Sequence, residues 1–313
     1  MTAEEQLAQL QALVNHSYQT DAKRLQENSQ KMYQSTISVY ERTIRERFPA
    51  VNPYPITEAT MRAFLTIQKD EKHRACNTLI NYIAGFAHYF QSKQLPDLTK
   101  TASFHTYRLG LGKEMRQHIV PNRKLPILPE HMEKFAQKVD HSDLKQIQWM
   151  ASMSLMFLGF LRISEFLTLK ISDITLEEDR VRIHIQFSKT DTTGRGDDVV
   201  ILRGAKSYDA HYWVSSYYGR LNLKEMASER FLPYSATEFR VLVKSCLRQI
   251  GIEEVGQYSS HSFRRGGAHE ASRRGVADSV IKAHGRWRSN CFQIYTNVST
   301  IRAGEVLTGR LNE

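Results

Sequence analysis

The sequence is poor in cysteine, has no long apolar run and carries fewer acidic than basic residues. Its three cysteines, Cys76, Cys246 and Cys291, are widely separated, which argues against a disulfide framework or a zinc knuckle and favours a reducing compartment. No segment approaches the roughly 18 consecutive apolar residues of a membrane-spanning helix. The first residues, "MTAEEQLAQL", lack the cationic start and apolar core of a signal peptide. We therefore expect a soluble, intracellular protein with no membrane partner.

The shortage of acidic residues leaves a formal charge of +10 at pH 7 and a pI of about 9.4. Half of that excess lies between residues 259 and 295, where seven Lys and Arg accompany only Glu270 and Asp278. A basic surface gains affinity for nucleic acid by releasing counterions. This distribution predicts an anionic ligand for the segment.

The length of 313 residues allows two domains, each with its own core. Three of the eight prolines fall within "PNRKLPILP", where the residues before each proline are extended and no helix continues. We therefore predict a helical domain over 1–120, a linker over 121–129 and a second domain over 130–313. Both domains carry an excess of Lys and Arg.

The first part of the chain has the apolar spacing of helices throughout. Apolar residues recur at intervals of three and four, and Pro55 and Thr57 precede the first run as helix-start signals. The residues of this pattern are Met61, Phe64 and Leu65, followed by Leu79, Ile80, Ile83, Phe86, Ala87 and Phe90. The pattern predicts a compact helical domain, preceded by a looser helix within residues 1–30.

The second part mixes helices with strands. "LKQIQWMASMSLMFLGFL" (144–161) is apolar on nearly every face, which marks a buried helix. "VRIHIQF" (181–187) alternates apolar and polar residues, and "DVVIL" (198–202) follows the turn "SKTDTTGRGD", so we predict a β-hairpin with a long tip. Gly285 is placed for a left-handed cap of a helix over 276–284. The predicted fold is mostly α, with a small antiparallel β-sheet in the second domain.

Several positions in the second part carry candidate chemistry, and each also has an ordinary structural explanation. Arg162 follows the most apolar helix, where an unpaired guanidinium is costly to desolvate. Glu165 lies three residues on, so the two form either a structural pair or a poised one. His261 and Arg264 have the spacing of one helical face, on a helix that a preceding serine can cap. They form either an anion site or a solvated basic helix end.

Lys189 lies at the predicted hairpin tip, where a lysine is usually a solubilising turn residue. Tyr295 follows "SNCFQI", and by itself it has the spacing of a packing residue. The order of all these residues is more specific. They lie in "GFLRISEFLTLKISDI", "SKTDTTGRGDDVVI", "HSFRRGGAHEASRRGV" and "HGRWRSNCFQIYTN". These segments, in this order, resemble the tyrosine recombinase (phage-integrase) superfamily. The wording "HSFRRGGA" with "IKAHGRWRS" resembles most the eukaryotic mobile-element recombinases of the Crypton and DIRS types.

This resemblance implies a two-domain clamp that closes on duplex DNA, with residues 1–120 as the DNA-binding domain and residues 130–313 as the catalytic domain. It implies that the chain cleaves and rejoins strands through a 3′-phosphotyrosyl intermediate, without a metal ion or cofactor. The implied assignments are Tyr295 as nucleophile, Arg162 and Arg264 as phosphate ligands, and Lys189 as general acid. His261 would act as acid/base toward Tyr295 or support the phosphate, and Glu165 would orient Arg162 or His261.

One position departs from the family pattern. The residue nine before the nucleophile is usually His or Trp, and here it is Arg286, with Trp287 beside it and His284 close by. We expect Trp287 to supply the missing hydrogen bond or packing. Arg286, His284 and Arg265 are candidate DNA contacts.

The partner that the resemblance implies is double-stranded DNA. A dimer would bind each site, a homotetramer would hold two duplexes, and a eukaryotic host would place the protein in the nucleus. Two other interpretations stay open at this point. A type IB topoisomerase-like enzyme would nick and close DNA by the same chemistry, and a domesticated descendant would bind DNA without cutting it.

Overall fold

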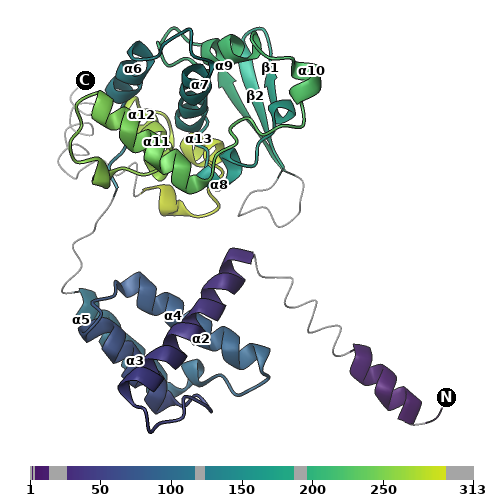
Figure 1. Cartoon of the computed structure of the whole chain (residues 1–313), viewed down its shortest axis with the longest axis vertical. Helices are drawn as coiled ribbons and strands as arrows, with labels where there is room; N and C mark the ends of the chain where they lie inside the picture. The colour runs from purple at the N-terminus through teal and green to yellow at the C-terminus, as the bar shows by residue number, and fades with distance from the viewer. Residues whose placement is uncertain (1, 3, 14–26, 117–123, 187–195, 294–313) are drawn as a thin grey trace, which may run out of the picture. The chain divides into compact units, whose positions relative to one another are not determined.

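The computed structural model describes residues 2, 4–13, 27–116, 124–186 and 196–293 of the chain (Figure 1). The chain divides into two compact units, Met1–Pro121 and Asn122–Glu313. Across the described ranges, no helix combines the length and apolar character needed to cross a membrane. The roles expected for the two parts of the chain stay predictions at this point.

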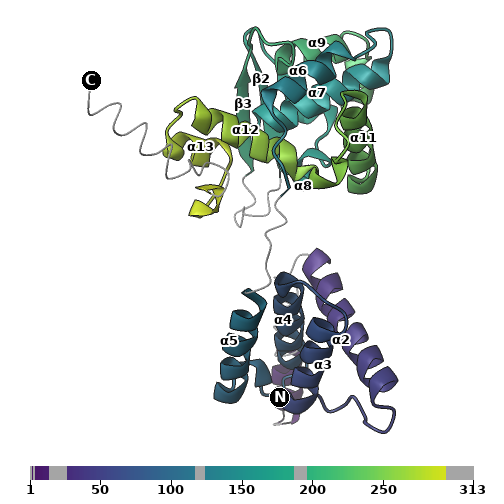
Figure 2. The same cartoon turned by 90° about the vertical axis from the view of Figure 1, so that its left-hand side faces the viewer.

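The regular secondary structure in the described part of the first unit consists of helices alone. Residues 4–13 form a helix, and the helices after it pack together as a bundle (Figure 2). The bundle comprises α2 (Glu27–Arg47), α3 (Glu58–Asp70), α4 (Cys76–Ser92) and α5 (Ala102–Arg116), with the 3₁₀ turn η1 (Leu98–Lys100) before α5.

The core of the bundle is built around three aromatic rings. Tyr40, Phe64 and Phe86 are fully buried, and each pair meets edge to face with centroids 5.3–5.7 Å apart. Such pairs each contribute about 0.5–1.5 kcal/mol beyond the area that they bury. The Tyr40 hydroxyl donates to the carbonyl of Pro53 at 2.9 Å, so its polar end is satisfied.

Two sequence-based expectations for this unit have different outcomes. Thr57 caps α3, because its hydroxyl accepts from the amide of Thr60 at 3.2 Å, so the predicted helix start is confirmed. Ile80 was assigned to the apolar face of α4, but it is 54% exposed. The buried face of α4 runs through Leu79, Ile83 and Phe86, and Ile80 lies beside that row on the solvent side.

The second unit combines a helical core with one small sheet (Figure 1). Its main helices are α6 (Pro129–Gln137), α7 (Leu144–Leu158), α9 (Ala210–Tyr218), α11 (Ala236–Gln249) and α12 (His261–Arg273). Its shorter turns and helices are α8 (Ile163–Phe166), η2 (Ile171–Asp173), α10 (Leu223–Met226), η3 (Val255–Gln257), α13 (Asp278–His284) and η4 (Asn290–Phe292). The strands are β1 (Ile174–Leu176), β2 (Arg180–Ile185) and β3 (Asp197–Leu202).

The sheet is antiparallel with the order β1-β2-β3, so the predicted hairpin is confirmed and β1 is an additional strand. Val181 pairs with Ile201 and Ile183 with Val199. On β2 these apolar side chains alternate with Arg182 and other polar ones, and on β3 they alternate with the exposed Val200 and Leu202, which places one face of the sheet against the core. α9 packs on the sheet, and α7 packs on both α9 and α12.

Helix α7 is the predicted buried helix, and its sequence explains its place at the centre of the unit. Asp143 caps it by accepting from the amide of Lys145 at 2.8 Å. Ile147, Met150 and Leu155 are completely buried. Burying one such side chain contributes about 1.5–3 kcal/mol, so the helix is held by its apolar surface on several faces.

The described part of the predicted linker runs along the second unit. The amide of Leu125 donates to the carbonyl of Gln257 at 2.7 Å, and that of Ile127 donates to the carbonyl of Ser262 at 2.9 Å. Ile127 is completely buried, and Pro129 is the first residue of α6. Residues 124–128 are therefore part of the second unit's packing.

The predicted left-handed cap at Gly285 is wrong. Gly285 has φ −78°, and the left-handed residue is the next one, Arg286, with φ +55°. Glycine is required at 285 for another reason, because a Cβ there would overlap the ring of Trp287. The chain thus ends α13 with an arginine in a conformation that favours glycine, which costs roughly 1 kcal/mol.

Candidate functional site

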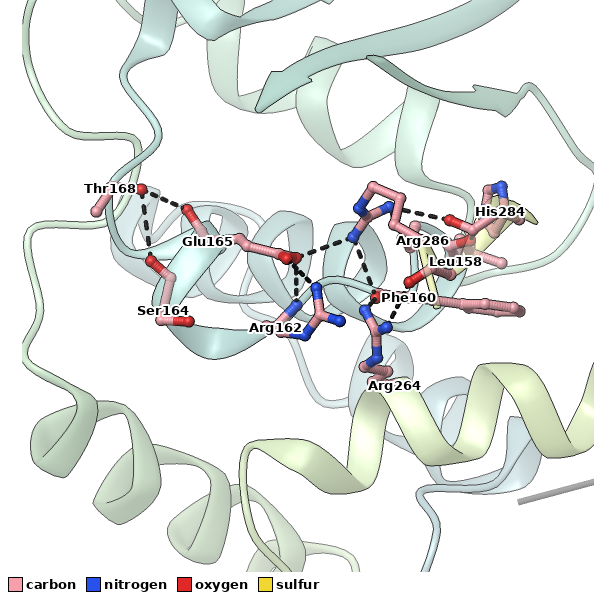
Figure 3. Close-up of polar contacts among 11 residues, drawn as sticks. Leu158, Phe160, Arg162, Ser164, Glu165, Thr168, Arg264, His284 and Arg286 are labelled. Carbon is pink, nitrogen blue, oxygen red and sulfur yellow. Dashed lines mark hydrogen bonds and ion pairs between the residues drawn. The ribbon is translucent and has the colours of Figure 1, made fainter. Parts of the chain in front are cut away.

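Four of the predicted residues lie close together near the C-terminal end of α7 (Figure 3). Arg162 and Glu165 come from the start of α8, Arg264 from α12 and Arg286 from the turn after α13. Figure 3 shows their side chains converging on the Glu165 carboxylate and the Phe160 carbonyl. Segments far apart in the sequence therefore form a single cluster.

The Arg162–Glu165 pair predicted from spacing is present. The chain leaves α7 through Phe160, whose φ is +48°, and Arg162 is the residue that precedes α8. Its amide donates to Glu165 Oε2 at 2.9 Å, and its guanidinium Nη1 donates to Oε1. Glu165 is 1% exposed, whereas the Arg162 side chain keeps 19% of its surface exposed.

Arg264 is completely buried under a ring. Its Nη1 donates to the carbonyl of Phe160 and its Nη2 to that of Gly285, while its guanidinium carbon lies 4.1 Å from the Trp287 ring centroid. Close packing of α12 on α7 brings it there, because a Cβ on Gly267 would overlap the Phe157 carbonyl. Trp287 was expected to supply packing, and the group that its ring contacts is the Arg264 guanidinium.

Arg286 lies inside the cluster. Its Nη2 donates to Glu165 Oε2 at 2.9 Å and its Nη1 to the His284 carbonyl at 3.0 Å. Its side chain is only 7% exposed. This arginine is therefore bound to protein groups rather than presented on the surface.

Glu165 is ionised between these arginines. Burial by itself raises the pKa of its carboxyl, but the charge of Arg286, the amide of Arg162 and the guanidinium of Arg162 outweigh burial and lower that pKa. The cluster holds three guanidiniums and this one carboxylate, so it keeps a net positive charge at neutral pH. An anion is the complementary ligand.

His261 stands at the start of α12, and its side chain is exposed. Partial desolvation, followed by the positive charges of Arg264, Arg162 and Arg265, lowers its pKa from 6.5. No serine side chain caps this helix: the Ser262 hydroxyl accepts from the amide of Ser259 at 2.9 Å.

Two of the candidate DNA contacts are engaged with the protein. His284 Nε2 donates to the Leu158 carbonyl at 2.8 Å, and its ring meets that of Phe160 edge to face. Burial is the main cause that lowers the pKa of His284. Arg265 Nη1 donates to the carbonyl of Lys124 and so fastens residues 124–128 to α12.

The Phe160 carbonyl was not expected from the sequence. It accepts from Arg264 and lies 3.4 Å from Arg286 Nη2, so it links two of the three guanidiniums. A backbone group gives no residue-type signal, and only the position of Phe160 just before Arg162 pointed to it. Lys189 and Tyr295 lie outside the described residues. Within the described part, no three His, Cys, Asp or Glu side chains are grouped to hold a metal ion.

Solved structures with a similar fold include recombinases and integrases. The Tn1549 transposon integrase in complex with transposon right end DNA aligns with a TM-score of 0.63 at 14% identity, over 95% of this chain and 98% of that one. The XerH site-specific recombinase bound to a palindromic difH substrate gives 0.61 at 16%, over 90% and 78%. A lambda integrase dimer bound to a COC′ core site gives 0.60 at 16%, over 92% and 77%.

These likenesses show the fold, which is the mostly helical fold with a small sheet that the sequence predicted. No curated protein sequence matches the chain. Residues 127–302 match the phage integrase family, and this range includes the arginine cluster together with Lys189 and Tyr295. Because the match spans more than half of the sequence, the chain belongs to the phage integrase family.

Proposed function

We propose that this protein is a site-specific DNA recombinase or transposase that cleaves and rejoins DNA through a 3′-phosphotyrosyl intermediate. The observation that carries the proposal is the convergence of Arg162 and Arg264 in one positively charged cluster, within the range that matches the family. Two guanidiniums around one point suit a phosphate with charge developing on its non-bridging oxygens.

The reaction conserves phosphodiester energy by exchanging one ester for another. Tyr295 Oη attacks phosphorus, the bond to the 5′-oxygen breaks, and that oxygen leaves as a hydroxyl after taking a proton from Lys189. His261 serves Tyr295 as acid/base or supports the phosphate. Rejoining reverses these steps with a 5′-hydroxyl from the partner duplex.

The two arginines meet the phosphate at different stages in this scheme. Arg162 offers a partly exposed guanidinium to an incoming phosphate. Arg264 is completely buried and donates to the carbonyls of Phe160 and Gly285, so the groups that cover it must move before a phosphate oxygen reaches its guanidinium. Glu165 orients Arg162 throughout, since both of its oxygens accept from that residue.

Double-stranded DNA is the proposed partner, clamped by the helical DNA-binding domain and the catalytic domain. Support comes from the similar proteins, since the Tn1549 integrase structure contains transposon DNA and the lambda integrase structure is a dimer on a core site. We propose a dimer per site and a homotetramer on two duplexes. The wording of the motifs supports a mobile-element recombinase of the Crypton or DIRS type, which would act on nuclear DNA.

Trapping the covalent intermediate tests the proposal. The full chain is incubated, without magnesium, with a pool of nicked duplexes whose central sequence is randomised, and protein–DNA adducts are isolated under denaturing conditions. We expect adducts from the wild type and none from Tyr295→Phe. Absence of an adduct from the wild type, or an undiminished adduct from Tyr295→Phe, would show that the mechanism is wrong.

A further inference from the structure

We propose that Arg286 is a positioning residue that shares the Glu165 carboxylate with Arg162 and so leaves Arg162 with positive charge for the scissile phosphate. This inference rests on the proposed function. It replaces the expectation that Arg286 contacts DNA, and it gives the position that is usually His or Trp in this family a different task.

The hydrogen bonds at Glu165 show the sharing. Oε2 accepts from the Arg162 amide and from Arg286 Nη2, both at 2.9 Å, while Oε1 accepts from the Arg162 guanidinium. One carboxylate therefore serves two guanidiniums, and the three groups together carry one net positive charge. With a neutral residue at 286, Glu165 would neutralise Arg162 alone, and the same group would carry no net charge.

The setting of Arg286 prevents it from serving as a surface phosphate ligand. Its side chain is 7% exposed, and its two terminal nitrogens are directed at Glu165 and at the carbonyls of His284 and Phe160 (Figure 3). Its backbone is in the left-handed region, with φ +55°, which points the side chain inward. Reaching a phosphate outside would break the ion pair with a carboxylate that is itself 1% exposed, a costly change.

Arg286 also connects the two arginines that the mechanism needs. Arg264 and Arg286 both approach the Phe160 carbonyl, and Arg162 follows that carbonyl by two residues. The strained φ of Phe160 places its carbonyl toward both guanidiniums. Removing Arg286 is therefore expected to shift Arg162 and Arg264 relative to each other as well as to change the charge.

The test separates cleavage from DNA binding. Single-turnover adduct formation is measured for saturating full-length protein on a nicked duplex taken from the trapped pool. Arg286→Ala is expected to slow adduct formation by about 100-fold, the scale of a misplacement of about 1 Å. Arg286→Lys, which keeps a point charge beside Glu165, is expected to recover part of the rate.

Non-covalent affinity for a random-sequence duplex, followed by fluorescence anisotropy over a range of salt, gives the second readout. A positioning residue leaves the affinity and its salt dependence unchanged in Arg286→Ala. A direct phosphate ligand would instead lower the slope of log affinity against log salt by about one. That result would overturn the inference.

Coupling to Glu165 gives the third readout. If Arg286 acts through Glu165, Arg286→Ala costs less rate in a Glu165→Gln background than in the wild type. Equal losses in both backgrounds would contradict the inference. If Arg286→Ala does not fold, as judged by circular dichroism, Arg286→Gln replaces it in each comparison and is expected to be slower than Arg286→Lys.

Arg288→Ala is the matched control, because it removes one positive charge from an exposed side chain two residues away. Its adduct should form at the wild-type rate, and a loss as large as that of Arg286→Ala would overturn the inference. The two proposals fail differently. Absence of a wild-type adduct contradicts the proposed function, whereas a wild-type adduct with an equally fast Arg286→Ala variant contradicts only the role of Arg286.

Discussion

We expect Trp287 to contribute both to the stability of the fold and to the rate of DNA cleavage. Its ring is 7% exposed, covers the Arg264 guanidinium and packs against Phe160 and Phe292. Trp287→Ala should lower the free energy of unfolding by about 3–5 kcal/mol, measured by urea unfolding. It should also slow adduct formation more than Arg286→Ala, because Arg264 loses the ring that holds it. Trp287→Phe keeps a ring and is the control, and equal or reversed losses of the two alanine variants would contradict this assignment.

The pH profile reports on His261. Its pKa is lowered from 6.5, first by partial desolvation and then by Arg264, Arg162 and Arg265, so the ring is neutral at pH 7. If the neutral ring accepts the proton of Tyr295, the rate of adduct formation is constant above pH 6.5 and falls as the pH drops through the lowered pKa. His261→Asn should be slow and lack this step. A wild-type rate that rises on acidification would point to support of the phosphate by the charged ring instead.

The residues of the site were predictable from the sequence to different degrees. Spacing alone gives the Arg162–Glu165 pair, because residues three apart share one side of a helical turn. The resemblance of the segment around Arg264 to the family's motif gives this arginine its expected role. The inward direction of Arg286 was not predictable, since it depends on a left-handed backbone and on a carboxylate 121 residues earlier in the chain. Local sequence carries no signal for either.

The contact between residues 124–128 and α12 belongs to the scale of elements. A Cβ on Gly266 would overlap the backbone carbonyl of Ile127, and backbone cannot yield as a flexible side chain does. Gly266→Ala should therefore separate this segment from α12, lower the free energy of unfolding by several kcal/mol, and slow adduct formation by displacing Arg264.

Gly110→Ala is the matched control for Gly266→Ala. A Cβ there meets nothing within 4 Å, and the residue lies in α5. Alanine at this position should raise the free energy of unfolding by about 0.5–1 kcal/mol, because alanine favours a helix over glycine. Thermal and urea unfolding of both variants give the comparison, and a Gly266→Ala protein as stable as the wild type would contradict the packing argument.

The β2–β3 hairpin carries Lys189 between its strands, and substrate chemistry can test the role of that lysine. A 5′-oxygen needs a proton to leave, whereas a sulfur in its place leaves as a thiolate with a conjugate-acid pKa of about 8.5. Lys189→Ala should therefore slow cleavage of the ordinary duplex strongly and that of the 5′-thio duplex little. Equal losses on both substrates, measured as adduct formation, would show that Lys189 is not the general acid.

Elements with strong local patterns were predictable, and those decided by tertiary contacts were not. Alternation of apolar and polar residues gives β2, the apolar run that follows the glycine-containing turn gives β3, and continuous apolarity gives α7. β1 has only three residues, which is too short for a recognisable period. A glycine directly after a helix predicts a left-handed cap, but at Gly285 the Trp287 ring imposes the glycine.

At the scale of the molecule, the composition of the basic segment 259–295 indicates a charged surface patch, but several of its arginines are engaged with other protein groups. Arg264 and Arg286 are engaged within the cluster, and Arg273 and Arg274 bind Glu270 at 2.7 and 2.6 Å. Much of the charge excess is therefore engaged in ion pairs and hydrogen bonds within the second unit. Net charge predicted an anionic ligand, but only the structure shows which cations are available to one.

Recombination and simple nicking-closing share every chemical step, so the outcome on DNA must separate them. A recombinase holds two cleaved duplexes and joins each 3′-phosphotyrosine to the 5′-hydroxyl of the other, whereas a topoisomerase-like enzyme returns the same hydroxyl. With a plasmid carrying two copies of a duplex recovered from the trapped adducts, we expect deleted or inverted products from the wild type and none from Tyr295→Phe. Relaxation of supercoils without exchanged products would favour the nicking-closing interpretation. Binding without either product would favour a domesticated DNA-binding protein.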